Sequence, residues 1–219
     1  MQIQVYPPVP AAQIRGAGPP SGRWSAAKQN GYAGSMPQDQ QPLAAGSARQ
    51  GEKAGKPAWG AQVLALLVFL AASALVAGLG GLASAANVDG WYATADKAPW
   101  SPPNWLFGPV WTFLYIAMAV AAWLVWRKRA EGTRRALTVY AVQLVLNLLW
   151  TPVFFGLYPT LGTPALWIAF GIIATLAVAV AVTVMRFGPI SRPAGLLMLP
   201  YLTWVVFASS LNLWAALNN

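Results

Sequence analysis

Residues 163–185 read TPALWIAFGIIATLAVAVAVTVM and contain no charged side chain. A helix of about 20 apolar residues spans the hydrocarbon core of a bilayer, because each residue adds about 1.5 Å along the helix axis. Four other uncharged apolar runs occur, at 59–86, 106–126, 136–155 and 193–217. The sequence therefore predicts an all-α integral membrane protein built as a bundle of five transmembrane helices.

The composition supports this prediction and narrows the possible chemistry. Hydrophobic residues make up 57% of the chain and charged residues only 9%, whereas an ordinary soluble domain carries about 25% charged residues. The chain has no cysteine and no histidine. Metal ligands of these two types, and nucleophiles activated by histidine, are therefore excluded. We expect no metal site and no conventional catalytic site.

The net charge is +9, and a basic balance can indicate nucleic-acid binding. The distribution of the charges indicates membrane topology instead. If the five spans alternate in direction, 13 of the 14 Lys and Arg residues lie on one side and Lys97 alone lies on the other. Because cytoplasmic loops collect basic residues, we expect a cytoplasmic N-terminus, a C-terminus outside and no nucleic-acid partner.

The first part of the chain, residues 1–57, is rich in Gly, Pro, Ala, Gln and Ser and has no sustained helical or strand period. Such a segment buries too little apolar surface to offset its chain entropy. We predict a disordered cytoplasmic tail at 1–57 and a transmembrane domain at 58–219. The tail is either a solvated basic segment that helps to fix topology or a segment that docks on anionic lipid or a partner.

The segment at 90–111 reads GWYATADKAPWSPPNWLFGPVW and joins the first two predicted spans. It contains four of the 12 tryptophans and four prolines. Proline fixes φ and lacks a backbone donor, while each indole offers a flat apolar face with one N–H donor. We predict a stiff, non-helical aromatic loop, in which residues 87–105 form a lid over a site between the helices.

Aromatic side chains recur at helical spacing next to this loop and in the fifth span. Trp111 and Tyr115 lie one turn apart and share a helix face. Trp204 and Ala208 are spaced in the same way, and a large indole followed by a small residue leaves a notch beside a flat wall. These positions are predicted to face inward.

The third span carries two amides, Gln143 and Asn147, on the same face as Tyr140 and Trp150. Amides in hydrocarbon must find hydrogen-bond partners. They either bond a neighbouring helix, for about 1–2 kcal/mol each at most, or line a cavity and present donors to a ligand.

The first span contains small residues four apart, Ala74 with Gly78 and Ala77 with Gly81. This spacing lets two helix backbones approach closely in lipid. The contact is expected either within the bundle or between two protomers.

Three separated groups of residues form a recognisable signature. The matching residues are Trp91, Tyr92, 97–103 (KAPWSPP), 108–111 (GPVW) and Tyr115; Gln143, Leu144, Asn147, Trp150, Phe154 and Phe155; and Pro200, Tyr201, Trp204, Phe207, Ala208, Leu211 and Asn212. Together they resemble the TspO/MBR family, which comprises the tryptophan-rich sensory proteins of bacteria and the mitochondrial translocator protein. The resemblance covers about residues 60–217.

This resemblance implies a five-helix homodimer, here in a bacterial plasma membrane, with a pocket beneath the first loop. It implies a tetrapyrrole such as protoporphyrin IX or haem, or another apolar small molecule, as ligand, with no obligatory cofactor. Together with the spacing, it gives these ligand-binding positions: Tyr92, Pro102, Trp105, Trp111, Tyr115, Gln143, Asn147, Trp150, Trp204 and Ala208.

Two positions depart from the family pattern. Animal members end the fifth span with a Tyr followed by a basic residue, a weak sterol-recognition pattern, whereas residues 211–215 here read LNLWA. Membrane lipid or sterol is therefore the less favoured ligand. The usual Lys-Pro of the loop is Lys97, Ala98 and Pro99 here.

We expect a membrane receptor or carrier for tetrapyrroles, acting in tetrapyrrole regulation, transport or stress sensing. The indoles of Trp111, Trp150 and Trp204 would sandwich the ring, and Lys97 would meet the carboxylates at its rim. Two alternatives remain open. One is light- or oxygen-dependent porphyrin breakdown, with Trp111 and Trp204 as the redox-active candidates, and the other is a sterol-handling membrane scaffold.

Overall fold

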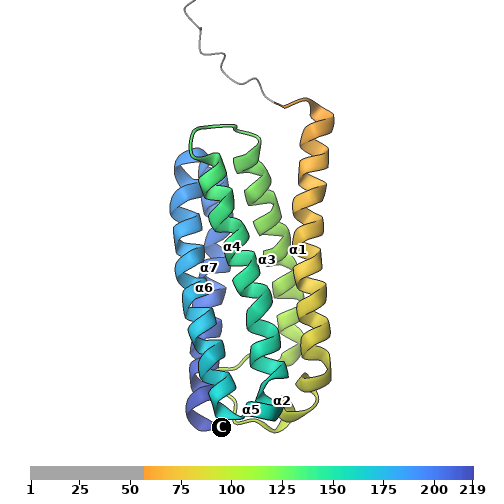
Figure 1. Ribbon diagram of the computed structural model, residues 1–219, viewed down its shortest axis with the longest axis vertical. Coiled ribbons are helices and arrows are strands. Elements are labelled where there is room, and N and C mark those ends of the chain that lie inside the picture. The colour runs from red at the N-terminus through yellow and green to blue at the C-terminus, as the bar shows by residue number, and fades with distance from the viewer. Residues whose placement is uncertain (1–56) are drawn as a thin grey trace, which may run out of the picture. The chain divides into compact units, whose positions relative to one another are not determined.

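The computed structural model describes residues 57–219, and this part of the chain is helical with no strand (Figure 1). Five long helical segments follow one another. They are α1 (Trp59–Val88), α3 (Asn104–Trp126), α4 (Thr133–Thr151) with its π-helical continuation η1 (Pro152–Gly156), α6 (Thr163–Ile190) and α7 (Arg192–Asn218). Two short helices, α2 (Trp91–Thr94) and α5 (Tyr158–Leu161), lie in the connections. The predicted tail lies outside the described residues, apart from Pro57.

All five long segments are long and apolar enough to cross a membrane, and α4 with η1 counts as one of them. The prediction of an all-α bundle with five spans is therefore confirmed. The observed helices are somewhat longer than the predicted ones. The largest difference is at α6, which continues to Ile190 because the long side chain of Arg186 can reach water from the end of a membrane helix.

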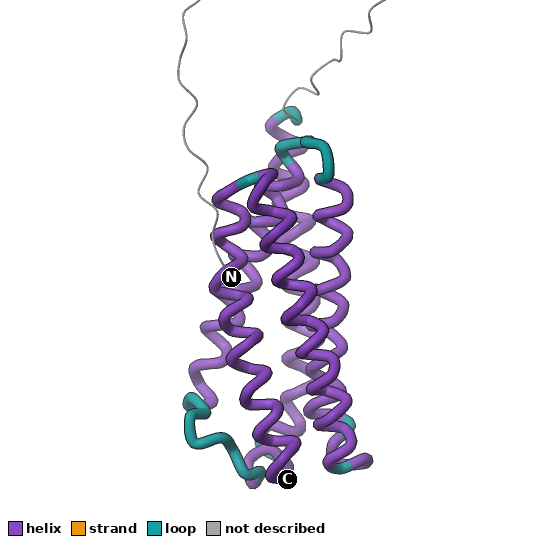
Figure 2. The backbone as a smooth tube through the Cα atoms, turned by 90° about the vertical axis from the view of Figure 1, so that its left-hand side faces the viewer, coloured by secondary structure: helices purple, strands orange, loops and turns teal. Residues whose placement is uncertain are grey.

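The long helices run side by side in a closed ring in which α1 packs on α3, α3 on α7, α7 on α6, α6 on α4 and α4 on α1. Figures 1 and 2 show the two ends of this bundle. One end, called the lid end here, holds α2, α5, the connection 89–103 and Asn219. The other end holds the α3–α4 and α6–α7 connections and carries Arg127, Lys128, Arg129, Arg134, Arg135, Arg186 and Arg192, and it is called the basic end.

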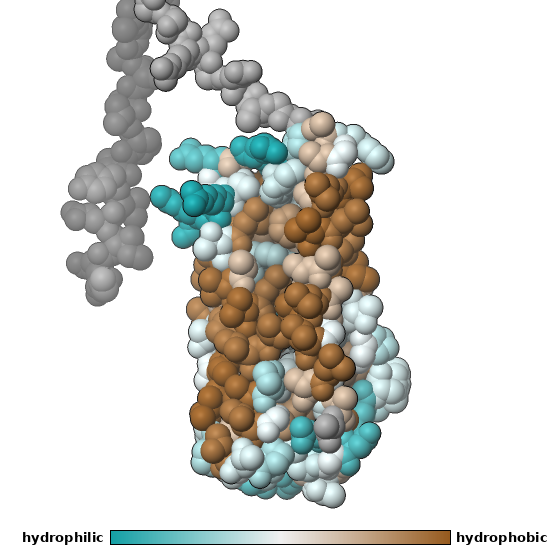
Figure 3. Space-filling model, turned by 45° about the vertical axis from the view of Figure 1, so that its right-hand side comes forward, coloured by the Kyte–Doolittle hydropathy of each residue, from teal (hydrophilic) through white to brown (hydrophobic). Residues whose placement is uncertain are grey.

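The outside of the bundle is apolar between these two ends. Large aliphatic side chains of α1 are more than half exposed, among them Leu64, Leu75 and Leu82. Figure 3 shows hydrophobic side chains between the two ends, with hydrophilic side chains gathered at the upper, basic end and at the lower, lid end. Such a band would be unstable in water and is stable in lipid. The chain is an integral, multi-pass membrane protein.

The segment predicted to be non-helical is partly helical, so this prediction is wrong at two places. Residues 91–94 form α2, and α3 begins at Asn104, directly after Pro102 and Pro103. Pro109 lies inside α3. It removes one backbone hydrogen bond near the start of the helix, a loss that membrane helices tolerate because their neighbours compensate for it.

The small residues of α1 do not make the predicted helix contact within the protomer. Gly78 and Gly81 are exposed, and a Cβ atom at either would meet nothing within 4 Å. Gly80 is the α1 glycine that faces a neighbour, since a Cβ there would lie 3.4 Å from Oγ1 of Thr151. A contact between protomers through these residues stays a prediction.

The closest approach involving a glycine is in the α6–α7 hairpin. A Cβ atom on Gly195 would lie 2.9 Å from the Cα atom of Gly188, whereas a Cβ atom on Gly188 would meet nothing within 4 Å. The side-chain direction of Gly195 therefore points at the Gly188 backbone near the turn at Ser191, whereas that of Gly188 points into open space.

We predict that Gly195→Ala lowers the midpoint of thermal unfolding in detergent, because overpacking against a backbone costs about 1–3 kcal/mol. Gly188→Ala is the control and leaves the midpoint unchanged or raises it, since alanine stabilises a helix by about 1 kcal/mol relative to glycine. Tryptophan fluorescence on heating measures both midpoints. Equal midpoints for the two variants would contradict the close approach.

Candidate functional site

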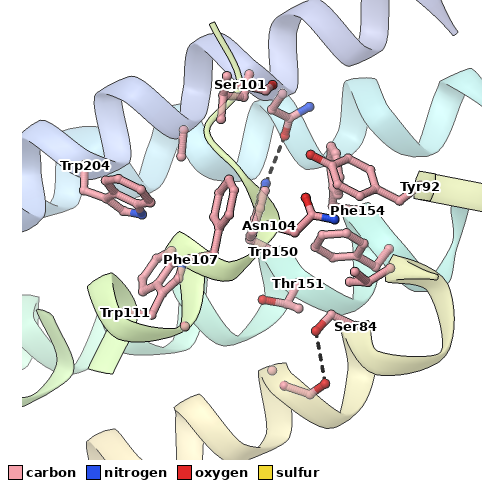
Figure 4. A pocket seen from close by; sticks show the side chains of 18 of the residues that line it. Ser84, Tyr92, Ser101, Asn104, Phe107, Trp111, Trp150, Thr151, Phe154 and Trp204 are labelled. Carbon is pink, nitrogen blue, oxygen red and sulfur yellow. Dashed lines mark hydrogen bonds between the residues drawn. The ribbon is translucent and has the colours of Figure 1, made fainter. Parts of the chain in front are cut away.

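A cavity of about 380 Å³ lies at the lid end, between α1, α3, α4 and α7 and below the 95–103 connection (Figure 4). Its lining residues come from separated parts of the chain. They are Ala77, Gly80, Gly81, Ser84 and Val88; Tyr92, Asp96, Lys97, Ala98 and Ser101; Asn104, Phe107, Gly108, Trp111, Thr112 and Tyr115; Asn147, Trp150, Thr151, Phe154 and Phe155; and Trp204, Ala208, Leu211, Asn212 and Ala215.

Aromatic side chains form much of the wall, and they are held by one another. Phe107 meets Trp204 edge to face, with 5.7 Å between ring centroids. Trp150 stacks on Phe154 at 5.2 Å. Trp111 is tilted against Tyr115 at 5.5 Å. These contacts fix flat apolar surfaces on α3, on α4 with η1, and on α7 (Figure 4).

A hydrogen-bond chain crosses the bundle at the deep end of the cavity. The Tyr115 hydroxyl donates to Oδ1 of Asn147 at 2.6 Å, and Nδ2 of Asn147 donates to the Tyr201 hydroxyl at 2.9 Å. Both ends of the Asn147 amide are thereby used within the protein. Asn147 lines the cavity, and its amide also joins α3, α4 and α7 by hydrogen bonds between helices, as in the first of the two alternatives given for the amides of the third span.

The indoles differ in their hydrogen bonding. Nε1 of Trp150 donates to Oδ1 of Asn212 at 2.9 Å, and Nδ2 of Asn212 donates to the Leu166 carbonyl at 3.0 Å. Nε1 of Trp204, in contrast, is buried and has no acceptor within residues 57–219. Since a buried donor without an acceptor is costly, this N–H destabilises the arrangement locally, while the Trp204 ring still forms part of the cavity wall.

The lid is fastened at several points to the rest of the bundle. Nε1 of Trp91 donates to the Phe155 carbonyl at 2.9 Å, and its ring stacks on Tyr158 with centroids 3.8 Å apart. Nε1 of Trp100 donates to Oγ of Ser210 at 3.2 Å. The short helix α2 is therefore held by η1 and α5, and the segment after it is held by α7.

Asn219 fastens the middle of the lid with its side chain. The Asp96 backbone N–H donates to Oδ1 of Asn219 at 2.8 Å, and Nδ2 of Asn219 donates to the Asp96 carbonyl at 3.1 Å. Two hydrogen bonds between one amide side chain and one backbone residue hold the 95–103 connection against the end of α7.

The lid also brings two opposite charges to the cavity. Asp96 and Lys97 both line it, and the Lys97 ammonium lies 4.9 Å from the centre of the Tyr92 ring. Burial raises the pKa of the Tyr92 hydroxyl above its ordinary value. Tyr92 therefore stays protonated at neutral pH and keeps a hydrogen-bond donor at the cavity wall.

Of the residues predicted to bind a ligand, the structure brings seven to the cavity: Tyr92, Trp111, Tyr115, Asn147, Trp150, Trp204 and Ala208. Pro102 and Trp105 do not line it, and the Trp105 side chain is 73% exposed, on a different face of α3 from Phe107 and Trp111. Gln143 is fully buried away from the cavity, and its Nε2 lies 3.8 Å from Sδ of Met118.

Sequence reasoning missed Phe107, Phe154 and the α1 wall. Phe107 lies one turn before Trp111, at the spacing already recognised for Trp111 and Tyr115. Extending that period backward would have found it, but the segment was expected to be non-helical. Small residues such as Gly80 give no signal that separates a cavity wall from a helix contact.

A model of the TspO/MBR family matches residues 65–217. The chain is 36% identical over 152 residues to the tryptophan-rich protein TspO of Archaeoglobus fulgidus, covering 68% of this chain and 94% of that protein. It is 40% identical over 146 residues to the tryptophan-rich sensory protein of Cereibacter sphaeroides, covering 67% and 85%. It is 37% identical over 145 residues to the translocator protein of Bos taurus, covering 63% and 82%.

We predict that Asn219→Ala speeds amide hydrogen exchange in residues 95–103 by about 5- to 100-fold, because the two hydrogen bonds lost contribute about 0.5–1.5 kcal/mol each. Asn218→Ala is the matched control, since the Asn218 side chain bonds only to Trp214 of its own helix. Exchange measured by mass spectrometry on both variants tests this. An unchanged rate in Asn219→Ala would show that the lid is held without this residue.

Proposed function

The chain belongs to the TspO/MBR family, and we propose that its lid-end cavity binds a tetrapyrrole, protoporphyrin IX or haem, in a membrane receptor or carrier. The observation that carries this proposal is the combination of flat aromatic walls with a lysine at the same cavity. A tetrapyrrole with propionates has the matching chemistry, a planar apolar ring and carboxylates at one edge. The cavity volume also lies in the range of about 300–1,000 Å³ that is usual for small-molecule sites.

Each part of the ligand has a counterpart among the lining residues. The ring contacts the faces of Trp111, Trp150 and Trp204, since aromatic contacts add about 0.5–1.5 kcal/mol each beyond burial. The carboxylates meet Lys97, with Asp96 beside it as an opposing charge.

The names of the relatives support a role in sensing or carrying a ligand. One is named a sensory protein and another a translocator protein. A cavity covered by a fastened lid suits both roles, because the lid separates an apolar ligand from the water at that end of the bundle.

We further propose that the lid end faces outside a bacterial plasma membrane and that the basic end is cytoplasmic. Within residues 57–219, seven of the eight basic side chains lie at the basic end and only Lys97 lies at the lid end. This distribution supports the orientation because basic residues collect on the cytoplasmic side.

The first test removes two aromatic walls. Trp111→Leu combined with Trp204→Leu should weaken protoporphyrin IX binding by about 5- to 100-fold, the loss expected for two aromatic contacts. Titration in the dark, followed by the porphyrin absorption band, measures the affinity. Trp105→Leu is the matched control, because Trp105 lies outside the cavity, and it should leave the affinity unchanged. If the double variant unfolds at the same temperature as the parent and binds equally well, the ligand lies elsewhere.

The second test separates the contribution of the carboxylates to the affinity from that of the ring. Lys97→Gln should weaken protoporphyrin IX binding by up to about fivefold, and Asp96→Asn should strengthen it by a similar factor, since exposed charges contribute about 0.2–1 kcal/mol. Neither substitution should change the affinity for the dimethyl ester of protoporphyrin IX, which lacks the charges. Equal effects on acid and ester would contradict a role of Lys97 toward the carboxylates.

A further inference from the structure

A second hollow, of about 520 Å³, lies at the basic end, on the opposite side of the membrane from the lid. It is formed where α3 ends and where α6 turns into α7. Its lining includes Leu124, Arg127 and Lys128 from α3, and Ser191, Arg192 and Pro193 from the turn. These residues are about 60 positions apart in the chain and converge on one place.

The hollow is strongly basic. Arg127, Lys128 and Arg192 line it, and none of its lining residues is acidic. Within residues 57–219, no carboxylate forms an ion pair with any of the three cations, and Glu131 is the single acid at this end. The Arg127 guanidinium is oriented by the Trp123 ring, 4.7 Å from its centre. Three unpaired cations around one hollow repel one another, and a bound anion relieves this repulsion.

The position of Ser191 is a second observation that points to an anion in the hollow. It is only 6% exposed, it lines the hollow, and it is the N-cap residue of α7. Its hydroxyl makes no capping hydrogen bond to the first turn of α7. A buried serine at an N-cap normally bonds the first turn of its helix. Here the hydroxyl is left available, together with N–H groups of the first turn, which have no acceptor in the helix.

The depth of the hollow suits a group at the membrane surface. Leu124 lines its inner side, and the hydrophobic band begins directly below the basic end (Figure 3). Basic pockets between transmembrane helices are known places for the headgroups of anionic lipids. The same cations would equally hold the phosphate of a small soluble compound.

We propose that this hollow is a phosphate-binding site, in which Arg127, Lys128 and Arg192 neutralise the anion and Ser191 donates a hydrogen bond to it. The phosphate comes either from the headgroup of an anionic phospholipid or from a soluble phosphate. The site does not depend on the tetrapyrrole proposed for the lid end. The proposal gives Arg127, Lys128 and Arg192 a role in binding. The other basic residues of this end do not line the hollow, and the preference of basic residues for the cytoplasmic side accounts for their position.

The test measures binding of short-chain phosphatidylglycerol, short-chain phosphatidylcholine and inorganic phosphate to the full chain in a neutral detergent, by calorimetry. The parent protein should prefer phosphatidylglycerol over phosphatidylcholine. Arg127→Gln with Arg192→Gln should reduce this preference by about tenfold or more, since charge-assisted hydrogen bonds are lost. Ser191→Ala should reduce it by about two- to tenfold without changing any charge.

The matched control is Arg134→Gln with Arg135→Gln, which removes two charges from the same end at positions that do not line the hollow. It should leave the preference unchanged. An equal loss in this control, or no preference in the parent together with no binding of inorganic phosphate, would overturn the proposal. Displacement of the lipid by millimolar inorganic phosphate would identify a soluble phosphate as the ligand, and resistance to displacement would identify the lipid headgroup. Porphyrin affinity should be the same in all these variants.

Discussion

The amide of Asn147 ties three helices together at one level of the bundle. It accepts from Tyr115 on α3 and donates to Tyr201 on α7. These two hydrogen bonds join the helices at defined residues, so they fix the relative heights of the three helices. Trp111 lies one turn from Tyr115, Trp150 one turn from Asn147 and Trp204 one turn from Tyr201, each in the direction of the lid. One hydrogen-bonded level therefore places three indoles around the same space.

The two ends of the bundle differ in how their polar and charged side chains are paired. At the lid end, polar groups are paired, through Trp91, Trp100 and Asn219, so a short irregular connection stays in place over the cavity. At the basic end, the charged groups of the α3 terminus and of the α6–α7 turn have no such partners within residues 57–219. Paired groups rigidify a segment, whereas unpaired cations attract ligands. This asymmetry places the two proposed sites, an aromatic cavity and a cationic hollow that binds an anion, at opposite ends of the bundle.

The fold could be predicted from hydropathy because five uncharged runs have no other stable arrangement in water or lipid. The site was predictable only where polar or aromatic residues marked the inner face, as at Tyr115, Asn147 and Trp204. Small and aliphatic residues carry no such mark, since lipid and protein interior are equally apolar, and the α1 wall of the cavity was missed for this reason. Gln143 shows a second limit. It shares a face with Asn147, but it lies one turn deeper, where the cavity has ended, and spacing alone does not give the depth of a cavity.

The small residues of α1 have the spacing of a helix contact but serve as a cavity wall. Their spacing is typical of two helices in close contact, but within this protomer Ala77, Gly81 and Ser84 line the cavity. The small residues of α1 leave this wall of the cavity without projecting side chains, while leucines of α1 are exposed on the outside of the bundle. Larger residues at these positions would fill the cavity without breaking the hydrogen bonds of Asn147 with Tyr115 and Tyr201. The sequence of α1 therefore determines how much space is left, and α3, α4 and α7 determine what surrounds that space.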